Sequence, residues 1–263
     1  INIKIVSFIS LMKLILLRHG QSEWNLENRF TGWEDVSLTK NGVEEAKFSG
    51  EAILDNSYNI KHIYTSNLKR AIETAHIVSD IIAFPKHKIQ YEWRLNERHY
   101  GALQGLNKAE TALKYGEAQV KIWRRSFDIP PPKLDKNDKR NPNNNSELKK
   151  LNNDLPIGES LKDVIKRLDP FLNDFFGKIS PDEKDCAESY DYLIVAHSNS
   201  LRAIVKILEQ LSNDEIIDIN IPTGVPLVYE INHNLQIINK EYLIDDDSLA
   251  RKQEIVKNQG KVK

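Results

Sequence analysis

The fold is decided by the stretch Leu14–Asn25, which reads LILLRHGQSEWN. Its aliphatic residues predict a short buried strand, and an arginine, a histidine and a glycine follow where that strand ends. In open α/β sheets, ligands bind beyond the carboxyl ends of the strands, so Arg18 and His19 lie where chemistry usually takes place. A neutral imidazole can accept a phosphoryl group, and a guanidinium pairs with phosphate oxygens. Gly20 removes the Cβ that would keep an anion from the backbone.

A second passage repeats this arrangement. Tyr192–Ala196 is a predicted strand that leads directly into the polar run HSNS, which begins at His197. Apolar residues then recur at helical spacing from Leu201 to Leu211, which indicates an amphipathic helix. Two histidines that each open a loop at the carboxyl end of a strand can meet across one crevice. The sequence therefore predicts one site that contains both His19 and His197.

Strands and helices alternate along the chain, which predicts an α/β fold: a mainly parallel central sheet with helices on both faces, in three layers. Strands are expected over residues 13–17, 62–65, 88–91, 192–196, 227–232 and 236–242. Helices are expected over residues 40–54, 67–82 and 161–177. Thr39 and Ser66 are the candidate N-caps of the first two, and a capping-box pattern at Ser160 opens the third. Pro170 should bend that third helix.

Composition excludes several classes of protein. The chain has 263 residues, of which 40% are hydrophobic, and a net charge of −1, so no overall field favours nucleic acid or membrane as a partner. No apolar run reaches the roughly 18 residues that a membrane span needs. The lone Cys186 excludes an intrachain disulfide and is typical of a cytoplasmic protein. No metal is expected, because no ligand cluster with recognisable spacing is formed by His62, His76, His87, His99 and His233.

The expected organisation is a single α/β domain over residues 12–245 with an irregular segment at three places. Residues 1–11 are expected to be a disordered extension; they faintly resemble a signal peptide, but no small-residue cleavage site follows. An upstream translation start or a cloning remnant is therefore favoured. Residues 133–154 are rich in asparagine and lack periodicity, which predicts a loop insertion, extended or mobile. The polar residues 246–263 are expected to be a flexible C-terminal tail.

With these features in place, the run LRHGQSEWN at 17–25 resembles the signature of the cofactor-dependent phosphoglycerate mutases, in the histidine phosphatase superfamily. The resemblance continues at NRFTGW (28–33), TSNLKRA (65–71), LNERHYG (95–101), LNKAE (106–110), WRRSF (123–127), NIPTG (220–224) and LVYE (227–230). It extends from Met12 nearly to the C-terminus in the family's order, which makes it far more specific than the tripeptide Arg-His-Gly alone.

The resemblance implies an isomerase of glycolysis and gluconeogenesis, acting on 3-phosphoglycerate and 2-phosphoglycerate through a phosphohistidine, with 2,3-bisphosphoglycerate as the phosphoryl primer. It implies His19 as the nucleophile and Glu97 as the acid and base. His197, Arg18 and Arg70 would stabilise the transferring phosphoryl group. The implied substrate-binding residues are Arg18, His19, Gly20, Gln21, Ser22, Glu23, Trp24, Asn25, Thr31, Gly32, Arg70, Glu97, Arg98, His99, Tyr100, Lys108, Arg124, Arg125, Ser198 and Asn199. A homodimer or homotetramer is also expected.

One residue departs from the family pattern, since Ser198 stands where the family usually has glycine. Serine keeps the main-chain N–H and would be strained only at positive φ. Two alternatives stay open. A phosphatase would let water take the phosphoryl group, and a non-catalytic protein would merely bind phosphorylated ligands. The second alternative would expect the loss of His19, Glu97 or His197, and all three are present.

Overall fold

The computed structural model describes residues 11–179, 190–232, 234–259 and 261, and within them six strands form one sheet. The strands are β1 (Met12–Arg18), β2 (Ile60–Thr65), β3 (Gln90–Tyr91), β4 (Asp191–Ala196), β5 (Pro226–Ile231) and β6 (Ile237–Tyr242), in the order β3-β2-β4-β1-β5-β6. β1, β4, β2 and β3 are parallel to one another, whereas β5 and β6 add an antiparallel edge. The predicted mainly parallel sheet is confirmed.

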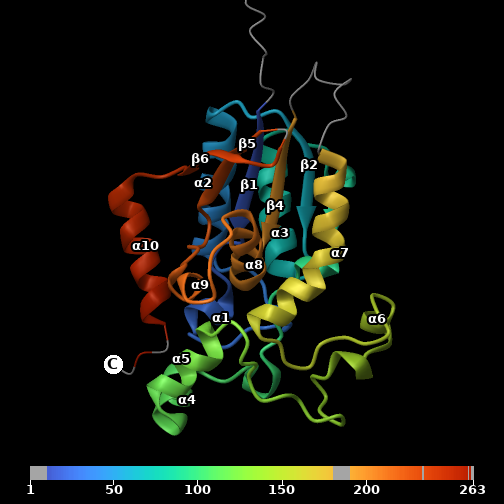
Figure 1. The fold of residues 1–263 in the computed structure, drawn as a ribbon, viewed down its shortest axis with the longest axis vertical. Coiled ribbons are helices and arrows are strands. Elements are labelled where there is room, and N and C mark those ends of the chain that lie inside the picture. Colours follow the sequence, from blue (N-terminus) through green and yellow to red (C-terminus); the bar gives the residue numbers. More distant parts are fainter. Residues whose placement is uncertain (1–10, 180–189, 233, 260, 262–263) are drawn as a thin grey trace, which may run out of the picture.

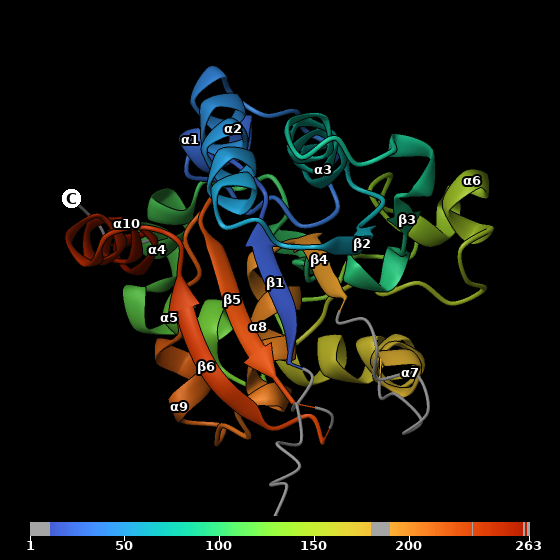
Figure 2. The ribbon, with the colours of Figure 1, turned by 90° about the horizontal axis from the view of Figure 1, so that it is seen from above.

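Helices cover both faces of this sheet. They are α1 (Glu23–Leu26), α2 (Lys40–Asp55), α3 (Lys69–Ile81), α4 (Lys108–Tyr115), α5 (Glu117–Arg125), α6 (Ser146–Lys149), α7 (Leu161–Ile179), α8 (Ser198–Leu208), α9 (Glu215–Asp218) and α10 (Asp246–Asn258). Viewed along the sheet, α2 and α3 lie on one side and α7 and α8 on the other (Figure 2). This arrangement confirms the three predicted layers. None of the described helices is both long and apolar enough to cross a membrane.

The two cores follow from the alternation of side chains along β1. Leu14 and Leu16 pack in the cluster formed with α7 and α8. Ile15 and Leu17 point the opposite way, into the cluster formed with α2 and α3. All four side chains are fully buried. A strand that is covered on both faces has consecutive apolar residues in its sequence. This is why the sequence of β1 predicted a buried strand within a layered α/β fold. Because β1 is fixed by this burial, the polar residues Arg18 and His19 at its carboxyl end are fixed at the edge of the sheet.

Of the three predicted helix N-caps, two are confirmed and one is wrong. Thr39 caps α2 by accepting a hydrogen bond from Gly42 N, and Ser160 exchanges hydrogen bonds with Asp163 at the start of α7. The prediction of Ser66 as the N-cap of the next helix is wrong. α3 begins after Leu68, whose side chain makes no cap. The Ser66 hydroxyl accepts from Leu68 N at 3.2 Å, before the helix, and also pairs with a histidine far away in the sequence.

Two other elements differ from expectation or refine it. The strand expected over residues 88–91 is reduced to β3, because a 3₁₀ turn over Lys86–Lys88 precedes it. Pro170 lies inside α7, and the ribbon of this helix changes direction along its length (Figure 1).

The asparagine-rich segment over residues 133–154 is more ordered than a plain extended loop. It contains a 3₁₀ turn, Pro142–Asn144, followed by α6. Leu134 is buried, and the Asn143 amide exchanges hydrogen bonds with the main chain of Leu155 at 2.8 and 2.9 Å. Local side-chain hydrogen bonds therefore supply the order that the sequence's missing apolar periodicity could not indicate.

The C-terminal segment also forms a regular element. α10 lies beside the β6 edge of the sheet (Figure 1) and is tied to α2 by an ion pair between Lys252 and Glu45 at 2.9 Å. Its far end returns to the carboxyl end of the parallel strands, where Gln259 reaches the site described below. The extension expected over residues 1–11 lies, except for Leu11, outside the described residues.

Candidate active site

The two strand-end histidines lie together. β1 and β4 are neighbours in the sheet, Arg18 pairs with Ala196, and the His19 N–H donates to the carbonyl of Ala196 at 3.0 Å. This register brings the rings of His19 and His197 to a centroid distance of 4.9 Å. Both side chains are almost fully buried. The sheet therefore produces the pairing that the two strand-to-loop passages predicted.

The hydrogen bonds of His19 define its chemical form. Nδ1 lies 2.7 Å from the carbonyl oxygen of Gly20, which can only accept, so Nδ1 carries the proton. Nε2 is therefore unprotonated, and its lone pair accepts a hydrogen bond from Arg70 Nε at 3.3 Å. Burial, followed by the charges of Arg70 and Arg18, holds the pKa of His19 well below its usual value. His19 is thus a neutral imidazole with Nε2 available as a nucleophile.

The arginines beside His19 are held by main-chain carbonyls. Arg70 donates to the carbonyls of Glu34 and Gly32, both at 2.9 Å, and Arg18 donates to Ile221 at 2.8 Å. These contacts fix the guanidinium groups without neutralising their charge. Arg18 Nε is buried and has no hydrogen-bond partner among the described residues. An anion placed between the arginines would therefore meet unneutralised charge and an unsatisfied donor.

His197 is anchored by the serine that the sequence had suggested as a helix cap. Its Nε2 lies 2.7 Å from Ser66 Oγ, while Nδ1 is buried and has no partner among the described residues. Burial and then the charge of Arg70 hold the pKa of His197 well below its usual value. The main-chain position of His197, directly before α8, is the one predicted.

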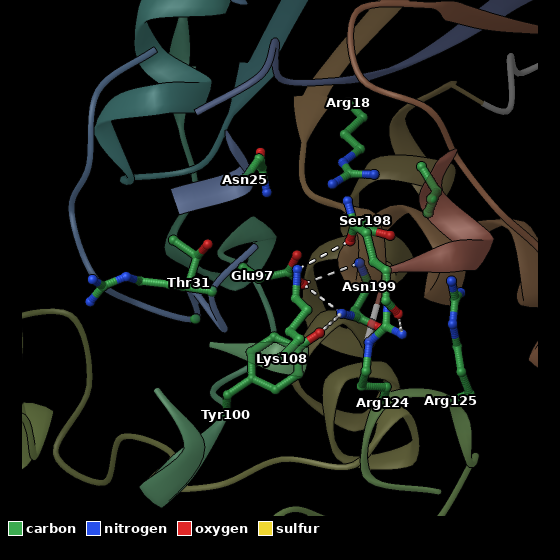
Figure 3. A pocket seen from close by; sticks show the side chains of 14 residues that line it. Arg18, Asn25, Thr31, Glu97, Tyr100, Lys108, Arg124, Arg125, Ser198 and Asn199 are labelled. Carbon is green, nitrogen blue, oxygen red and sulfur yellow. Dashed lines mark hydrogen bonds between the residues drawn. The ribbon is translucent and has the colours of Figure 1, made fainter. Parts of the chain in front are cut away.

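Glu97 faces the same site with one oxygen fully engaged. Oε1 accepts a hydrogen bond from Arg98 N at 2.8 Å. It also accepts from Asn199 N at 3.1 Å and from Asn199 Nδ2 at 3.0 Å (Figure 3). The side chain is 7% exposed. A carboxylate held in this way near the histidines is placed to exchange a proton with a bound ligand.

The segment that carries Glu97 is supported from behind by residues that sequence reasoning missed. Glu159 and Arg167 form a buried ion pair at 2.7 Å. Arg167 also donates to the carbonyl of Asn96 at 3.2 Å, and Glu159 accepts from the His99 N–H at 2.8 Å. This pair fixes the main chain on either side of Glu97. Nothing local in the sequence signals it, because Arg167 lies on the helix opposite the segment.

A pocket opens in front of Glu97 (Figure 3). It is lined by Arg18, Asn25, Arg29, Thr31, Gly32, Glu97, Tyr100, Lys108, Arg124, Arg125, Ser198, Asn199, Val256 and Gln259. Five of these lining residues are cationic and one is a carboxylate. Sequence reasoning missed Arg29, Val256 and Gln259. The excess of positive charge suits a ligand that carries several negative charges.

The cations on the outer side of the pocket are bonded to the C-terminal segment. Lys108 Nζ donates to Gln259 Oε1 at 3.1 Å, and Arg124 donates to the Gln259 carbonyl. Burial and then the charge of Arg124 hold the pKa of Lys108 well below its usual value. Burial and then Arg125 lower the pKa of Arg124 to about 9. In both cases the second cause is the charge of a neighbouring arginine, so these cations repel one another.

Several expected binding residues lie outside the pocket lining. His99 is fully buried behind it, where Nδ1 accepts a hydrogen bond from Gly101 N at 3.0 Å. Arg98 stacks on Tyr100, with its guanidinium carbon 4.6 Å from the ring centre. Gln21 bonds to α2 and its N-cap through Glu45 and Thr39. The remaining ones outside the lining are Gly20, Ser22, Glu23 and Trp24, together with the buried His19 and Arg70.

The reason for a glycine at position 20 differs from the expected one. A Cβ built on Gly20 would lie 2.1 Å from the carbonyl oxygen of Gly42 in α2. The missing side chain therefore allows the strand end to approach α2 closely.

Comparison with known proteins agrees with this geometry. Residues 14–240 match the family described as the histidine phosphatase superfamily, branch 1. A protein of Hydrogenobaculum sp. named 2,3-bisphosphoglycerate-dependent phosphoglycerate mutase is 51% identical over 251 residues, covering 94% of this chain and 98% of that protein. A protein of the same name from Treponema denticola is 51% identical over 253 residues, covering 96% and 100%.

Solved structures share the fold at much lower identity. A structure titled mycobacterial hydrolase 1 is 20% identical with a TM-score of 0.67, covering 88% of this chain and 97% of that one. A mycobacterial glucosyl-3-phosphoglycerate phosphatase complexed with VO3 is 22% identical with a TM-score of 0.63, covering 83% and 92%. Both similarities bear on the fold alone. From the family match and the two close relatives, the chain belongs to branch 1 of the histidine phosphatase superfamily and, within it, to the 2,3-bisphosphoglycerate-dependent phosphoglycerate mutases.

Proposed function

We propose that the protein interconverts 3-phosphoglycerate and 2-phosphoglycerate through a phosphohistidine at His19. The observation that carries this proposal is the neutral His19 with its Nε2 directed at Arg70, beside a pocket whose lining holds five cations and one carboxylate. The names of the two relatives at 51% identity support the same reaction. The function is therefore that of an isomerase working by phosphoryl transfer.

His19 and Glu97 divide the chemistry between them. Nε2 of His19 attacks phosphorus, so that an N–P bond forms while the P–O bond to the glycerate breaks. Glu97 gives its proton to the departing oxygen and, in the reverse transfer, takes the proton from the attacking hydroxyl. Nδ1–H of His19 remains on the Gly20 carbonyl throughout and stabilises the ring as it gains positive charge. Arg18 and Arg70 stabilise the charge on the phosphoryl oxygens.

The residues present fit 2,3-bisphosphoglycerate as the primer. When bound, this compound supplies the phosphoryl group that loads His19. Its two phosphates and carboxylate carry about four to five negative charges. Arg18, Lys108, Arg124 and Arg125 provide cations around the pocket, and the unsatisfied Arg18 Nε provides a buried donor for an anion. No step in this scheme calls for a metal ion.

The setting of the protein is also part of the proposal. The near-zero net charge and the single cysteine support a cytoplasmic enzyme that acts on small molecules, with neither nucleic acid nor membrane as a partner. The family resemblance supports a homodimer or homotetramer. Light scattering on the purified protein measures the oligomeric state directly, and a monomer at working concentration would contradict that part of the proposal.

The test of the function is an assay on 3-phosphoglycerate with and without 2,3-bisphosphoglycerate. We expect the primer to raise the formation of 2-phosphoglycerate strongly, with little release of inorganic phosphate. His19→Ala should lower turnover by at least about a thousandfold, because every transfer passes through this nitrogen. His87→Ala, an exposed histidine, is the matched control and should be unchanged. Release of phosphate as the main product would instead indicate a phosphatase.

A further inference from the structure

The proposed chemistry gives no role to the buried charge of Arg202. Arg202 lies on α8, one turn after Asn199, and its side chain is 1% exposed. Within the part of the chain that the structure describes, no carboxylate forms an ion pair with it, and its Nε has no hydrogen-bond partner. Burying a guanidinium without an ion pair is costly to stability. An apolar side chain would fill the same space without this cost, so we look for a role of the charge itself.

The contacts of Arg202 point toward Glu97. One guanidinium nitrogen donates to Asn199 Oδ1 at 2.9 Å, and the other donates to the carbonyl of Ile216 at 2.6 Å. The second contact holds the guanidinium in place between α8 and α9. The first contact occupies the oxygen end of the Asn199 amide.

This contact decides which way the amide faces. An asparagine amide has an acceptor at one end and a donor at the other, and a guanidinium can only donate. With Oδ1 facing Arg202, Nδ2 must face the opposite side. There it donates to Glu97 Oε1 at 3.0 Å and to the Tyr100 hydroxyl at 3.1 Å. A reversed amide would place an oxygen against the Glu97 carboxylate and an NH₂ group against the guanidinium.

The orientation of the amide in turn distinguishes the two oxygens of Glu97. Oε1 accepts three N–H donors, from Arg98 N, Asn199 N and Asn199 Nδ2. An oxygen surrounded by three donors cannot also carry a proton, so the exchangeable proton belongs on Oε2. We propose that Arg202 is a positioning residue that locks the Asn199 amide and thereby reserves Oε2 of Glu97 for proton exchange. This inference rests on the proposed function, because it assigns the acid and base of that reaction its active oxygen.

The competing explanation is purely architectural. In that case Arg202 serves to hold α9 against α8 through the Ile216 carbonyl, and its loss would weaken the fold without acting through Asn199. The two explanations differ in whether the effects of Arg202 and Asn199 on turnover are independent. A double-mutant cycle measures that dependence.

The experiment compares Arg202→Met, Arg202→Lys, Asn199→Ala and the double variant Arg202→Met/Asn199→Ala in the primed assay. Lysine retains a donor for Asn199 Oδ1, whereas methionine fills similar space without one. Lys206→Met on the same helix is the control, since Lys206 bonds to the nearby Leu211 carbonyl and lies over the Phe127 ring, and makes no contact with Asn199 or Glu97 among the described residues. Thermal unfolding of each variant reports stability separately, and kcat and KM are measured for each.

We expect Arg202→Met to lower kcat by about tenfold or more with KM changed by less than about threefold, because a misplaced proton donor slows the transfer rather than binding. Arg202→Lys should recover most of the loss. In the Asn199→Ala background, Arg202→Met should change kcat by less than about twofold. Lys206→Met should match the wild type.

The inference is overturned if Arg202→Met lowers kcat by the same factor in both backgrounds, or leaves kcat unchanged. If Arg202→Met does not fold, the comparison of Arg202→Lys with and without Asn199→Ala decides in the same way. Failure of the proposed function is distinct from either result, because the wild-type protein itself would then not convert 3-phosphoglycerate in the presence of primer.

Discussion

The inner and outer walls of the site are built differently. The inner wall consists of Arg18, His19, Arg70 and His197, and each of these is held by the protein's own core: main-chain carbonyls hold the first three, and Ser66 holds the last. The outer wall consists of Lys108 and Arg124 on α4 and α5, and both are bonded to one residue, Gln259 after α10. One wall is thus fixed by the sheet, and the other is completed by the end of the chain.

The difference indicates a division of tasks. The inner groups are held by the protein's own hydrogen bonds before any ligand binds, as preorganised stabilisation of a transition state requires. The outer cations bond to a neutral amide and a carbonyl, which a phosphate or carboxylate could replace with a stronger, charge-assisted partner. We therefore expect inner-wall changes to lower kcat and outer-wall changes to raise KM.

Glu97→Gln has the largest expected effect of the substitutions that follow from this comparison. The amide keeps the size of the side chain but cannot exchange a proton, so kcat should fall by about 10²- to 10⁴-fold while KM changes much less. Steady-state kinetics on 3-phosphoglycerate measure both. An unchanged kcat with a raised KM would make Glu97 a binding residue and would remove it from the chemistry.

Lys108→Met tests the outer wall. Loss of a charge-assisted bond to the ligand should cost about 1.5–3 kcal/mol, or roughly ten- to a hundredfold in KM, with a smaller change in kcat. Lys114→Met, an exposed lysine on the same helix, is the control. If Lys108→Met instead lowered kcat at constant KM, the division between the two walls would not hold.

Three inner-wall residues, Arg18, His19 and His197, were predictable from the sequence because their signals are local, whereas Arg70 was identified only by family resemblance. An apolar run that ends at Arg18 and another that ends at His197 both mark the carboxyl ends of buried strands, and parallel strands bring such ends to one edge. Ser66 shows where local reasoning fails. Its sequence context suits a helix cap, but α3 starts two residues later, and the hydroxyl makes a tertiary hydrogen bond to His197 at 2.7 Å that no local pattern indicates.

The outer wall could not be predicted in the same way. Lys108 and Arg124 look like ordinary surface charges and were identified only by family resemblance. Gln259 contacts Lys108 across 151 residues of sequence, and no pattern signals such a contact. Arg202 lies within an apolar helix, where a single arginine gives no sign of its partner.

The buried His99 behind the site gives a prediction for pH. Burial and then the charge of Arg167 lower its pKa to about 3 in the folded protein, against about 6.5 when unfolded. The unfolded state therefore binds more protons below pH 6.5. The contribution of His99 to the free energy of unfolding is complete above pH 6.5 and is lost as the pH falls toward 3. Each pH unit below 6.5 should cost about 1.4 kcal/mol from this group.

His99→Asn keeps an acceptor for Gly101 N and removes the titration. The free energy of unfolding is measured by chemical denaturation at several pH values between 6.5 and 5. Its slope against pH should be smaller in His99→Asn than in the wild type by the equivalent of about one proton. An unaltered slope in His99→Asn would mean that His99 titrates alike in both states. His19 and His197 contribute with the same sign, because their pKa values are also lowered by burial.

The smallest effect is expected at Ser198, which lies where the two walls meet. Ser198 is the first residue of α8 and is not among the described residues with positive φ, so serine stands without the strain that would require glycine. It lines the pocket, and its main-chain N–H is the group expected to bind phosphate. Ser198→Gly should therefore leave turnover and affinity within about twofold, as for changes that remove no required contact.

Titration of the wild type and Ser198→Gly with 2,3-bisphosphoglycerate decides between main chain and hydroxyl. If the hydroxyl were a ligand, losing its charge-assisted bond would weaken binding by about tenfold or more. Ser198→Ala separates the two further, since it removes the hydroxyl while keeping the helical backbone that glycine would loosen. Equal affinities in all three proteins would place the recognition in the N–H at the start of α8. That N–H follows His197 directly and is present with either residue, so the family's usual glycine and this chain's serine would serve the same contact.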